Sequence, residues 1–334
     1  MDKKIVDVAK HAGVSPATVS RVLNESSHVS DTTRRRVLEA VRELGYHPNA
    51  SAKNLRSQKT MTIGVSVGDI NTSYFAAIIK GVQQAAAERR YKVLICDIEN
   101  RKEKESEYLD LLRNRTVDGM VLVQPMTPLQ ELEALADNGY ELAVVGRYVE
   151  HPGIPCAYTD NVEFSRRVVT HLIEGGHRSV AFISGAPEAV DSYERLEGYL
   201  KALREQGIPF RPGMVEHGGW NEHGGYEAVN RLLDGSVGFS ALYTANDEMA
   251  LGVYRACRER GLRIPQDLAV VGVDDNRVSR YLSPALSTVS QPNFELGASA
   301  ARRLLSQMNG EREGDPRSIQ LPSELVVRES SHRA

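Results

Sequence analysis

The sequence predicts an all-α head of residues 1–48, a linking segment of residues 49–60, and an α/β body of two doubly wound parallel-sheet lobes. The head shows short amphipathic helical patterns that end at glycines, whereas the body alternates apolar runs with helical patterns, twice over. The charge is divided in the same way: residues 1–60 hold 11 Lys and Arg against 6 Asp and Glu, and the rest of the chain holds 30 against 38. A basic head on an acidic body indicates that only the head binds a polyanion.

The 334 residues are enough for two or three domains, and 41% hydrophobic and 25% charged residues are ordinary for a soluble protein. Cys96, Cys156 and Cys257 lie far apart without a CxxC spacing, which favours reduced thiols over disulfides or a zinc site. The first residues contain no apolar run of signal-peptide length, and no later segment approaches the length of a membrane span. We therefore expect a cytoplasmic protein with no membrane partner.

Two helices joined by a tight turn are expected at the start of the head. The first has apolar residues at positions i, i+3, i+4 and i+7 of one stripe, namely Ile5, Val8, Ala9 and Ala12. Gly13 suits a left-handed helix end, while Ser15 followed by Pro16 is an N-cap and a proline at the first helical position. This arrangement predicts a helix-turn-helix.

The second helix buries Val19, Val22 and Leu23, so its other face is free to meet DNA. Short side chains at its start let it lie deep in a major groove, where Arg21 can donate to guanine or phosphate and Ala17 can contact a thymine methyl group. A third helix, from Ser30 to Gly45, is expected to bury Val37, Leu38, Val41 and Leu44. The candidate DNA contacts of the head are Ser15, Pro16, Ala17, Thr18, Arg21 and Asn24.

The segment VAKHAGVSPATVSRVLN closely resembles the lactose/galactose-repressor family of bacterial transcription regulators, and GYHPNASAKNLRS continues the match. The resemblance implies that Pro16, Ala17 and Arg21 read operator bases. It also implies a hinge helix over residues 49–57, paired with its copy in the minor groove, with Leu55 as a wedge between base pairs. By composition alone the same segment also fits a flexible linker. The candidate hinge contacts are Asn49, Ala52, Leu55 and Arg56.

In the body we expect strands at TIGVSV, YKVLIC, GMVLV, LAVVG, SVAFIS, SALYT, LAVVGV and ELVV. Helical patterns lie between them, at residues 75–89, 103–114, 162–174, 194–205, 225–233 and 248–260. We assign residues 61–160 and 292–322 to the first lobe, and residues 161–291 and 323–330 to the second. A ligand is expected between the lobes, beyond the carboxyl ends of the strands.

Aromatic, amide, carboxylate and guanidinium side chains gather at these predicted strand ends, a mixture that suits a polyol. The candidate effector contacts are Asp69, Tyr74, Phe75, Gln124, Arg147, Arg195, Trp220, Asn246, Asp274 and Gln291. The body is similar to periplasmic sugar-binding proteins. That similarity implies that Tyr74 and Phe75 stack on the ligand, and that Arg147 and Arg195 are its two ligand arginines. The family's sugar sites often have Asp where this chain has Gly146, which leaves one hydroxyl contact to Asp69 or Asp97.

These observations predict a transcription regulator, a repressor of carbohydrate-utilisation genes that binds two-fold operator DNA as a homodimer and responds to a sugar-type effector. A purine- or nucleoside-responsive repressor of the same family is the alternative. No GxGxxG, GxxxxGK[ST] or GxSxG motif is present, so we expect neither an enzyme nor a cofactor. His217 and His223 do not have a zinc-site spacing, and we expect no metal.

Overall fold

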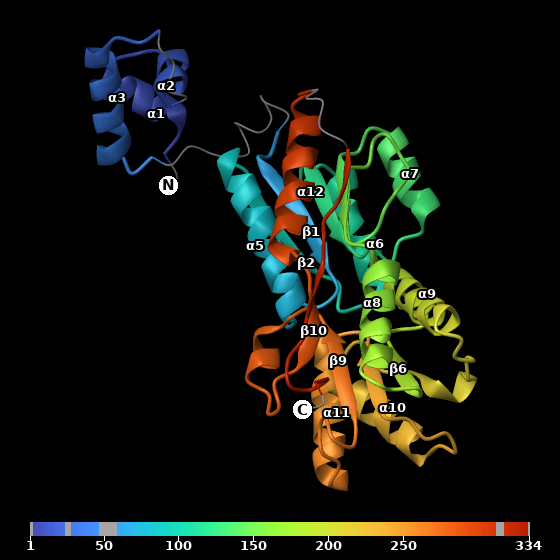
Figure 1. Cartoon of the computed structure of the whole chain (residues 1–334). Coiled ribbons are helices and arrows are strands. Elements are labelled where there is room, and N and C mark those ends of the chain that lie inside the picture. The colour runs from blue at the N-terminus through green and yellow to red at the C-terminus, as the bar shows by residue number, and fades with distance from the viewer. Residues whose placement is uncertain (1–2, 24–27, 47–58, 312–316, 333–334) are drawn as a thin grey trace. The chain divides into compact units, whose positions relative to one another are not determined.

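A computed structural model describes residues 3–23, 28–46, 59–311 and 317–332. The chain divides into two compact units, Met1–Thr60 and Met61–Ala334, and Figure 1 labels their elements. Asn24 and the predicted hinge contacts Asn49, Ala52, Leu55 and Arg56 lie outside the described residues.

The head contains α1 (Ile5–Ala12), α2 (Pro16–Leu23) and α3 (Asp31–Glu43). Gly13 has the expected left-handed conformation, with φ of 61°. The Ser15 hydroxyl accepts from the Thr18 amide at 3.2 Å, and the Ser30 hydroxyl accepts from the Thr33 amide at 3.4 Å. The predicted turn and helix starts are therefore confirmed, and each rests on local capping chemistry.

The head core is formed by side chains of all three helices, Val8, Ala9, Ala12, Val19, Val22, Val37 and Ala40, together with Tyr46 beyond α3. The prediction that Leu38 is buried is wrong, because its side chain is 38% exposed. The buried stripe of α3 passes through Val37, Ala40 and Val41, and Leu38 lies about 100° around the helix from Val37.

The first lobe is built on a six-stranded sheet in the order β11-β5-β4-β3-β1-β2. All of its pairings are parallel. Its strands are β1 (Thr62–Val67), β2 (Lys92–Asp97), β3 (Gly119–Val123), β4 (Leu142–Val145), β5 (Cys156–Tyr158) and β11 (Ser318–Gln320). Its helices are α5 (Ser73–Glu88), α6 (Lys102–Arg113), α7 (Leu129–Asp137) and α12 (Asn293–Met308).

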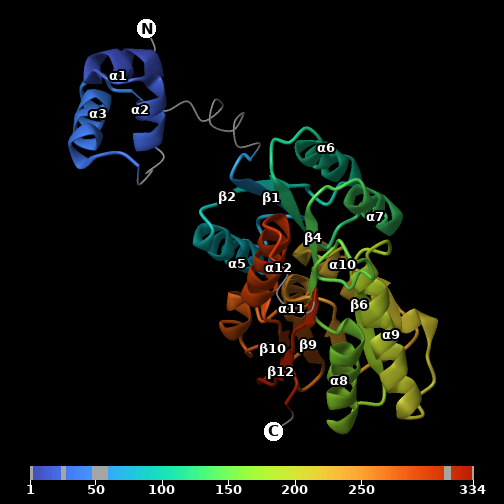
Figure 2. The same cartoon turned by 90° about the horizontal axis from the view of Figure 1, so that it is seen from above.

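The second lobe has a six-stranded sheet in the order β12-β10-β9-β8-β6-β7. Its strands are β6 (Val180–Ser184), β7 (Val215–His217), β8 (Ala241–Thr244), β9 (Ala269–Val273), β10 (Ser287–Ser290) and β12 (Glu324–Val326). It carries α8 (Asn161–Glu174), α9 (Val190–Glu205), α10 (Glu222–Asp234) and α11 (Asp247–Arg260), as Figure 2 shows from above, with the short helices η1 (Pro212–Met214) and η2 (Arg277–Arg280).

The fold class is confirmed, with one departure: β12 is antiparallel to β10, although we expected parallel strands. β11 ends at the carboxyl edge of the first sheet, and only residues 321–323 link it to β12. The chain therefore enters the second sheet from its carboxyl edge, and β12 runs antiparallel to its one neighbour, β10. The chain also passes between the lobes after β5 and after β10, so the carboxyl ends of both sheets face each other.

Within the body, α12 packs along α5 in both views (Figures 1 and 2) through glycines on each helix. A Cβ atom on Gly81 would lie 2.0 Å from the Phe294 carbonyl oxygen, and one on Gly297 would lie 2.2 Å from the Ile78 oxygen. Backbone atoms cannot rotate away as the end of a side chain can. Glycine is therefore needed at both positions for the two helix backbones to approach so closely.

Gly297→Ala is expected to lower the free energy of unfolding by up to about 2 kcal/mol. This is the overpacking cost of about 1–3 kcal/mol less the gain of about 1 kcal/mol in helix propensity. Urea denaturation of the full chain measures it as a lower midpoint. Lys80→Ala, an exposed change on α5, should stay within about 0.5 kcal/mol of the wild type. A Gly297→Ala protein at least as stable as the wild type would contradict the close packing.

Within the described part of the chain, no helix has both the length and the apolar character that a membrane span requires.

Candidate functional site

The face of α2 that is directed away from the head core carries the residues predicted to read DNA. Val19 and Val22 are buried, whereas Pro16, Ala17 and Arg21 are exposed and Thr18 is partly exposed. The Ser15 hydroxyl is engaged in the cap and lies 2.9 Å from the Thr18 hydroxyl. Short exposed side chains at the start of the helix and an arginine one turn later form a surface that can lie in a major groove.

In the body, predicted effector residues follow the strands directly. Gln124 comes after β3, Arg147 lies two residues beyond β4, Asp274 comes after β9 and Gln291 comes after β10. Asn246 caps α11: it accepts from the Met249 amide at 2.9 Å and donates to the Trp220 carbonyl at 3.0 Å. These positions arise from the sheets, which end at the edge where the lobes meet.

Arg195 is a buried charged group of this region, with 2% of its surface exposed. Its Nε donates to Asn161 Oδ1 at 2.9 Å, and its terminal nitrogens donate to the Ala245 carbonyl and to Asp191 Oδ2, the latter at 3.4 Å. The guanidinium carbon lies 5.3 Å from the centre of the Phe164 ring and 5.2 Å from that of Trp220. Protein groups thus hold this arginine through three hydrogen bonds and two aromatic rings.

One hydrogen bond joins the two lobes next to Arg195: Gln124 Nε2 donates to Asp191 Oδ2. Burial raises the pKa of Asp191, and Arg195 and Arg147 oppose that shift, in that order. The Asp191 carboxylate therefore lies 3.4 Å from one predicted ligand arginine, Arg195, and is also attracted by the other, Arg147. We call Tyr74, Gln124, Arg147, Asp191, Arg195 and Asp274 the interlobe site.

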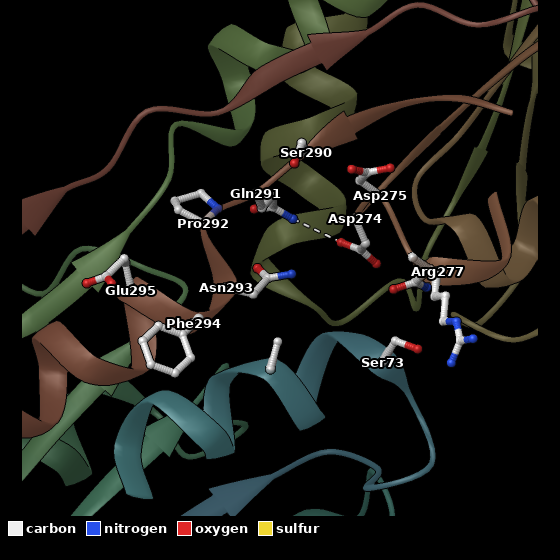
Figure 3. A pocket seen from close by; sticks show the side chains of 12 residues that line it. Ser73, Asp274, Asp275, Arg277, Ser290, Gln291, Pro292, Asn293, Phe294 and Glu295 are labelled. Carbon is white, nitrogen blue, oxygen red and sulfur yellow. Dashed lines mark hydrogen bonds between the residues drawn. The ribbon is translucent and has the colours of Figure 1, made fainter. Parts of the chain in front are cut away.

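A second link between the lobes runs through Gln291. Its Nε2 donates to Asp274 Oδ1 at 2.9 Å, and its Oε1 accepts from the Thr159 hydroxyl at 2.7 Å. Asp274 and Gln291 also line a pocket of about 400 Å³ beside the starts of α5 and α12 (Figure 3). Asn293 lines the same pocket, and its buried Oδ1 has no hydrogen-bond partner among the described residues.

The predicted aromatic residues lie at the same edge. Tyr74 is buried, with its ring edge-on to Phe75 at 5.0 Å between centres. Burial raises the pKa of Tyr74, and the negative charges of Asp191 and then Asp274 raise it further. Trp220 packs over Gly185, where a Cβ atom would lie 2.0 Å from the indole.

Two residues in this region bear on the hydroxyl contact left open by the sequence. Asp69 Oδ1 accepts from the backbone and side-chain nitrogens of Asn71, at 2.9 and 2.8 Å, and so closes its own turn. Gly146 has φ of 101°, and a Cβ atom there would lie 2.7 Å from Gln124 Cγ. The Gln124 side chain thus occupies the space that the Cβ atom of any larger residue at position 146 would need.

Sequence reasoning missed several buried groups in this region: Asp191, Asn161, Phe164, Glu105 and Thr127. The Asp191–Arg195 spacing of i, i+4 on a helix was a usable signal, because such residues lie on one face. No comparable local signal marked the other four. Among the described residues, no group of three or more His, Cys, Asp or Glu side chains is placed to hold a metal ion.

The chain is similar to known regulators over nearly its whole length. The catabolite control protein A of Priestia megaterium is 34% identical over 99% of this chain and 100% of its own, and the transcriptional repressor CytR of Escherichia coli K12 is 34% identical over 97% and 95%. Among solved structures, the Lac repressor dimer bound to operator and the anti-inducer ONPF has a TM-score of 0.88 at 29% identity, covering 99% of each chain.

A complex of the transcriptional regulator CelR with cellobiose is also similar, with a TM-score of 0.74 at 32% identity, covering 98% of this chain and 99% of that one. The family model for bacterial regulatory proteins of the lacI family matches residues 4–49, and the model for a periplasmic binding protein-like domain matches residues 169–331. This chain belongs to the LacI family of bacterial transcription regulators, DNA-binding proteins controlled by an effector and not enzymes.

Proposed function

We propose that this chain represses genes of carbohydrate utilisation, and that a sugar bound at the interlobe site changes its affinity for the operator. The observation that carries the proposal is the meeting of aromatic rings, amides, carboxylates and two arginines between the lobes. Aromatic faces cover the C–H faces of a sugar, and the polar groups bind its hydroxyls. The cellobiose complex of a similar regulator supports a sugar as the ligand class.

Coupling between ligand and DNA would start at the bond between Gln124 and Asp191. A sugar that contacts both side chains replaces this bond and thereby resets the distance between the lobes. A coupling free energy of about 3 kcal/mol corresponds to a change of roughly 100-fold in operator affinity. The sign of the change, release or tighter binding, follows from which lobe arrangement suits the operator.

A homodimer is the second part of the proposal, because one short recognition helix reads few base pairs and two-fold operators are read by pairs. The first lobe offers a surface for pairing: β2 is an edge strand, and its Leu94 and Ile95 side chains are 39% and 43% exposed. The similar Lac repressor structure is a dimer bound to operator. A regulator of transcription acts on the chromosome, so we place the protein in the cytoplasm.

Calorimetry on the full-length chain tests the ligand class. Pentoses, hexoses, disaccharides including cellobiose, and purines are titrated in turn into the wild type and into Asp274→Ala. We expect a sugar to bind the wild type and to bind Asp274→Ala much more weakly, because Asp274 can accept from a hydroxyl group. Binding of hypoxanthine without any sugar would favour the purine-responsive alternative and contradict the proposal.

A further inference from the structure

Glu105 is a fully buried carboxylate in the first turn of α6, outside the set of predicted ligand residues. Its Oε2 accepts from the Thr127 amide at 2.7 Å and from the Thr127 hydroxyl at 2.8 Å. The carbonyl of the same threonine accepts from a terminal nitrogen of Arg147 at 3.3 Å. Thr127 therefore connects the carboxylate of Glu105 to the guanidinium of Arg147.

The two charged groups do not form a direct ion pair among the described residues, and each keeps an unused polar atom. Glu105 Oε1 and Arg147 Nε are both buried without a hydrogen-bond partner in the described part of the chain. Burial lowers the pKa of Arg147, and Glu105 and then Asp191 are the strongest opposing influences. A guanidinium stays charged in proteins, so a buried one needs carboxylates of this kind nearby.

Arg195 has its own carboxylate, Asp191, at 3.4 Å. Each arginine of the interlobe site is thus matched by a buried acid, and the Asp274 carboxylate comes in addition. Glu194 lies beside them and accepts from Asn161 Nδ2 at 2.7 Å. Burial raises the pKa of all four of these carboxyl groups, and Arg147 or Arg195 opposes the shift at each of them, so the two guanidiniums already face carboxyl groups of the protein. A phosphate dianion placed here would meet more carboxyl groups than guanidinium groups, and like charges brought together weaken binding.

We propose that Glu105 is a positioning residue that holds and neutralises Arg147, so that the interlobe site takes an uncharged polyol and rejects its phosphorylated form. This inference rests on the proposed function and narrows its ligand class. Arg147 keeps Nε–H as a donor for a hydroxyl oxygen of the sugar, while Glu105 and Thr127 fix the direction of that donor.

The test is a calorimetric titration of the full-length chain with matched pairs: glucose and glucose 6-phosphate, ribose and ribose 5-phosphate, cellobiose and its 6-phosphate. The wild type should bind the free sugar of at least one pair, and should bind its phosphate at least about tenfold more weakly. The ratio of the affinity for the free sugar to the affinity for its phosphate should fall about tenfold in Glu105→Gln, because one negative charge beside Arg147 is removed. Glu105→Asp, which keeps the charge, should restore most of the ratio.

Glu107→Gln is the matched control, because Glu107 is an exposed residue two positions along the same helix and its neutralisation should leave the ratio unchanged. If Glu105 had a purely structural role, Glu105→Gln would weaken the binding of the free sugar and of its phosphate to the same extent. If the wild type binds a sugar phosphate as tightly as the parent sugar, this inference is overturned, while the proposed function stands. That result needs only the wild type and is decisive even if Glu105→Gln fails to fold. Absence of binding by every member of every pair overturns the proposed function as well.

Discussion

Replacing Arg195 with methionine is expected to lower the free energy of unfolding of the body by about 3–5 kcal/mol, the cost of leaving one partner of a buried ion pair alone. Methionine fills the space between the Phe164 and Trp220 rings, so little packing is lost. However, Asn161 Oδ1 and the Ala245 carbonyl lose the donor that Arg195 supplies, and the buried Asp191 carboxylate loses its counter-charge and keeps only the Gln124 amide as a donor. Unsatisfied buried acceptors account for the penalty.

Urea denaturation of the full chain measures this loss as a lower midpoint at an unchanged slope. The double variant Arg195→Met/Asp191→Leu is the matched control, because apolar residues in place of both charges are often neutral for stability. It should recover the part of the loss that the unpaired Asp191 carboxylate causes, because Asn161 Oδ1 and the Ala245 carbonyl still lack the donor that Arg195 supplied. An Arg195→Met protein within about 1 kcal/mol of the wild type would show that the pair carries little of the stability of the second lobe.

The second large effect is expected in DNA binding. Arg21→Ala should lower the affinity for a specific operator by about 1–3 kcal/mol per subunit, counted twice in a dimer, and should relax the base preference at one position of each half-site. The side chain is exposed on α2 next to the buried Val22, so its removal should leave the head folded. Fluorescence anisotropy on an operator obtained by selection from random DNA measures the change.

Arg35→Ala on α3 is the comparison variant, because its exposed guanidinium is suited to a phosphate contact. This variant should weaken binding to specific and to non-specific DNA to the same extent. It should also reduce the slope of the logarithm of the affinity against the logarithm of the salt concentration by about one. If Arg21→Ala behaved in the same way, with equal losses on operator and on scrambled DNA, Arg21 would be a backbone contact and not a base contact.

The elements of the head could be predicted because their signals are local. A glycine after the first helix, a serine and proline before the second, and Ser30 before the third all act within one turn of chain, and each is found in its expected role. Leu38 was misjudged because exposure depends on which side of α3 faces the other helices. That orientation is a tertiary property.

In the body, the long apolar strands were predicted, but β5, β7, β10 and β11 were not. These strands have three or four residues each and little alternation to mark them. Helix α12 was also missed, since it packs on α5 through Gly297 and several alanines where a wide apolar stripe would be expected. Glu105 could not be distinguished from its exposed neighbours on α6, because burial of a carboxylate is decided by Thr127, 22 residues further along the chain.

The central claim is that a sugar at the interlobe site controls operator binding, and operator affinity measured with and without sugar tests it most directly. Fluorescence anisotropy of the full-length wild type and of Asp274→Ala is recorded without sugar and with saturating cellobiose, glucose or ribose. We expect at least one of these sugars to change the operator affinity of the wild type by roughly 100-fold, and Asp274→Ala not to respond. Unchanged operator affinity with every sugar that binds the wild type would contradict the account.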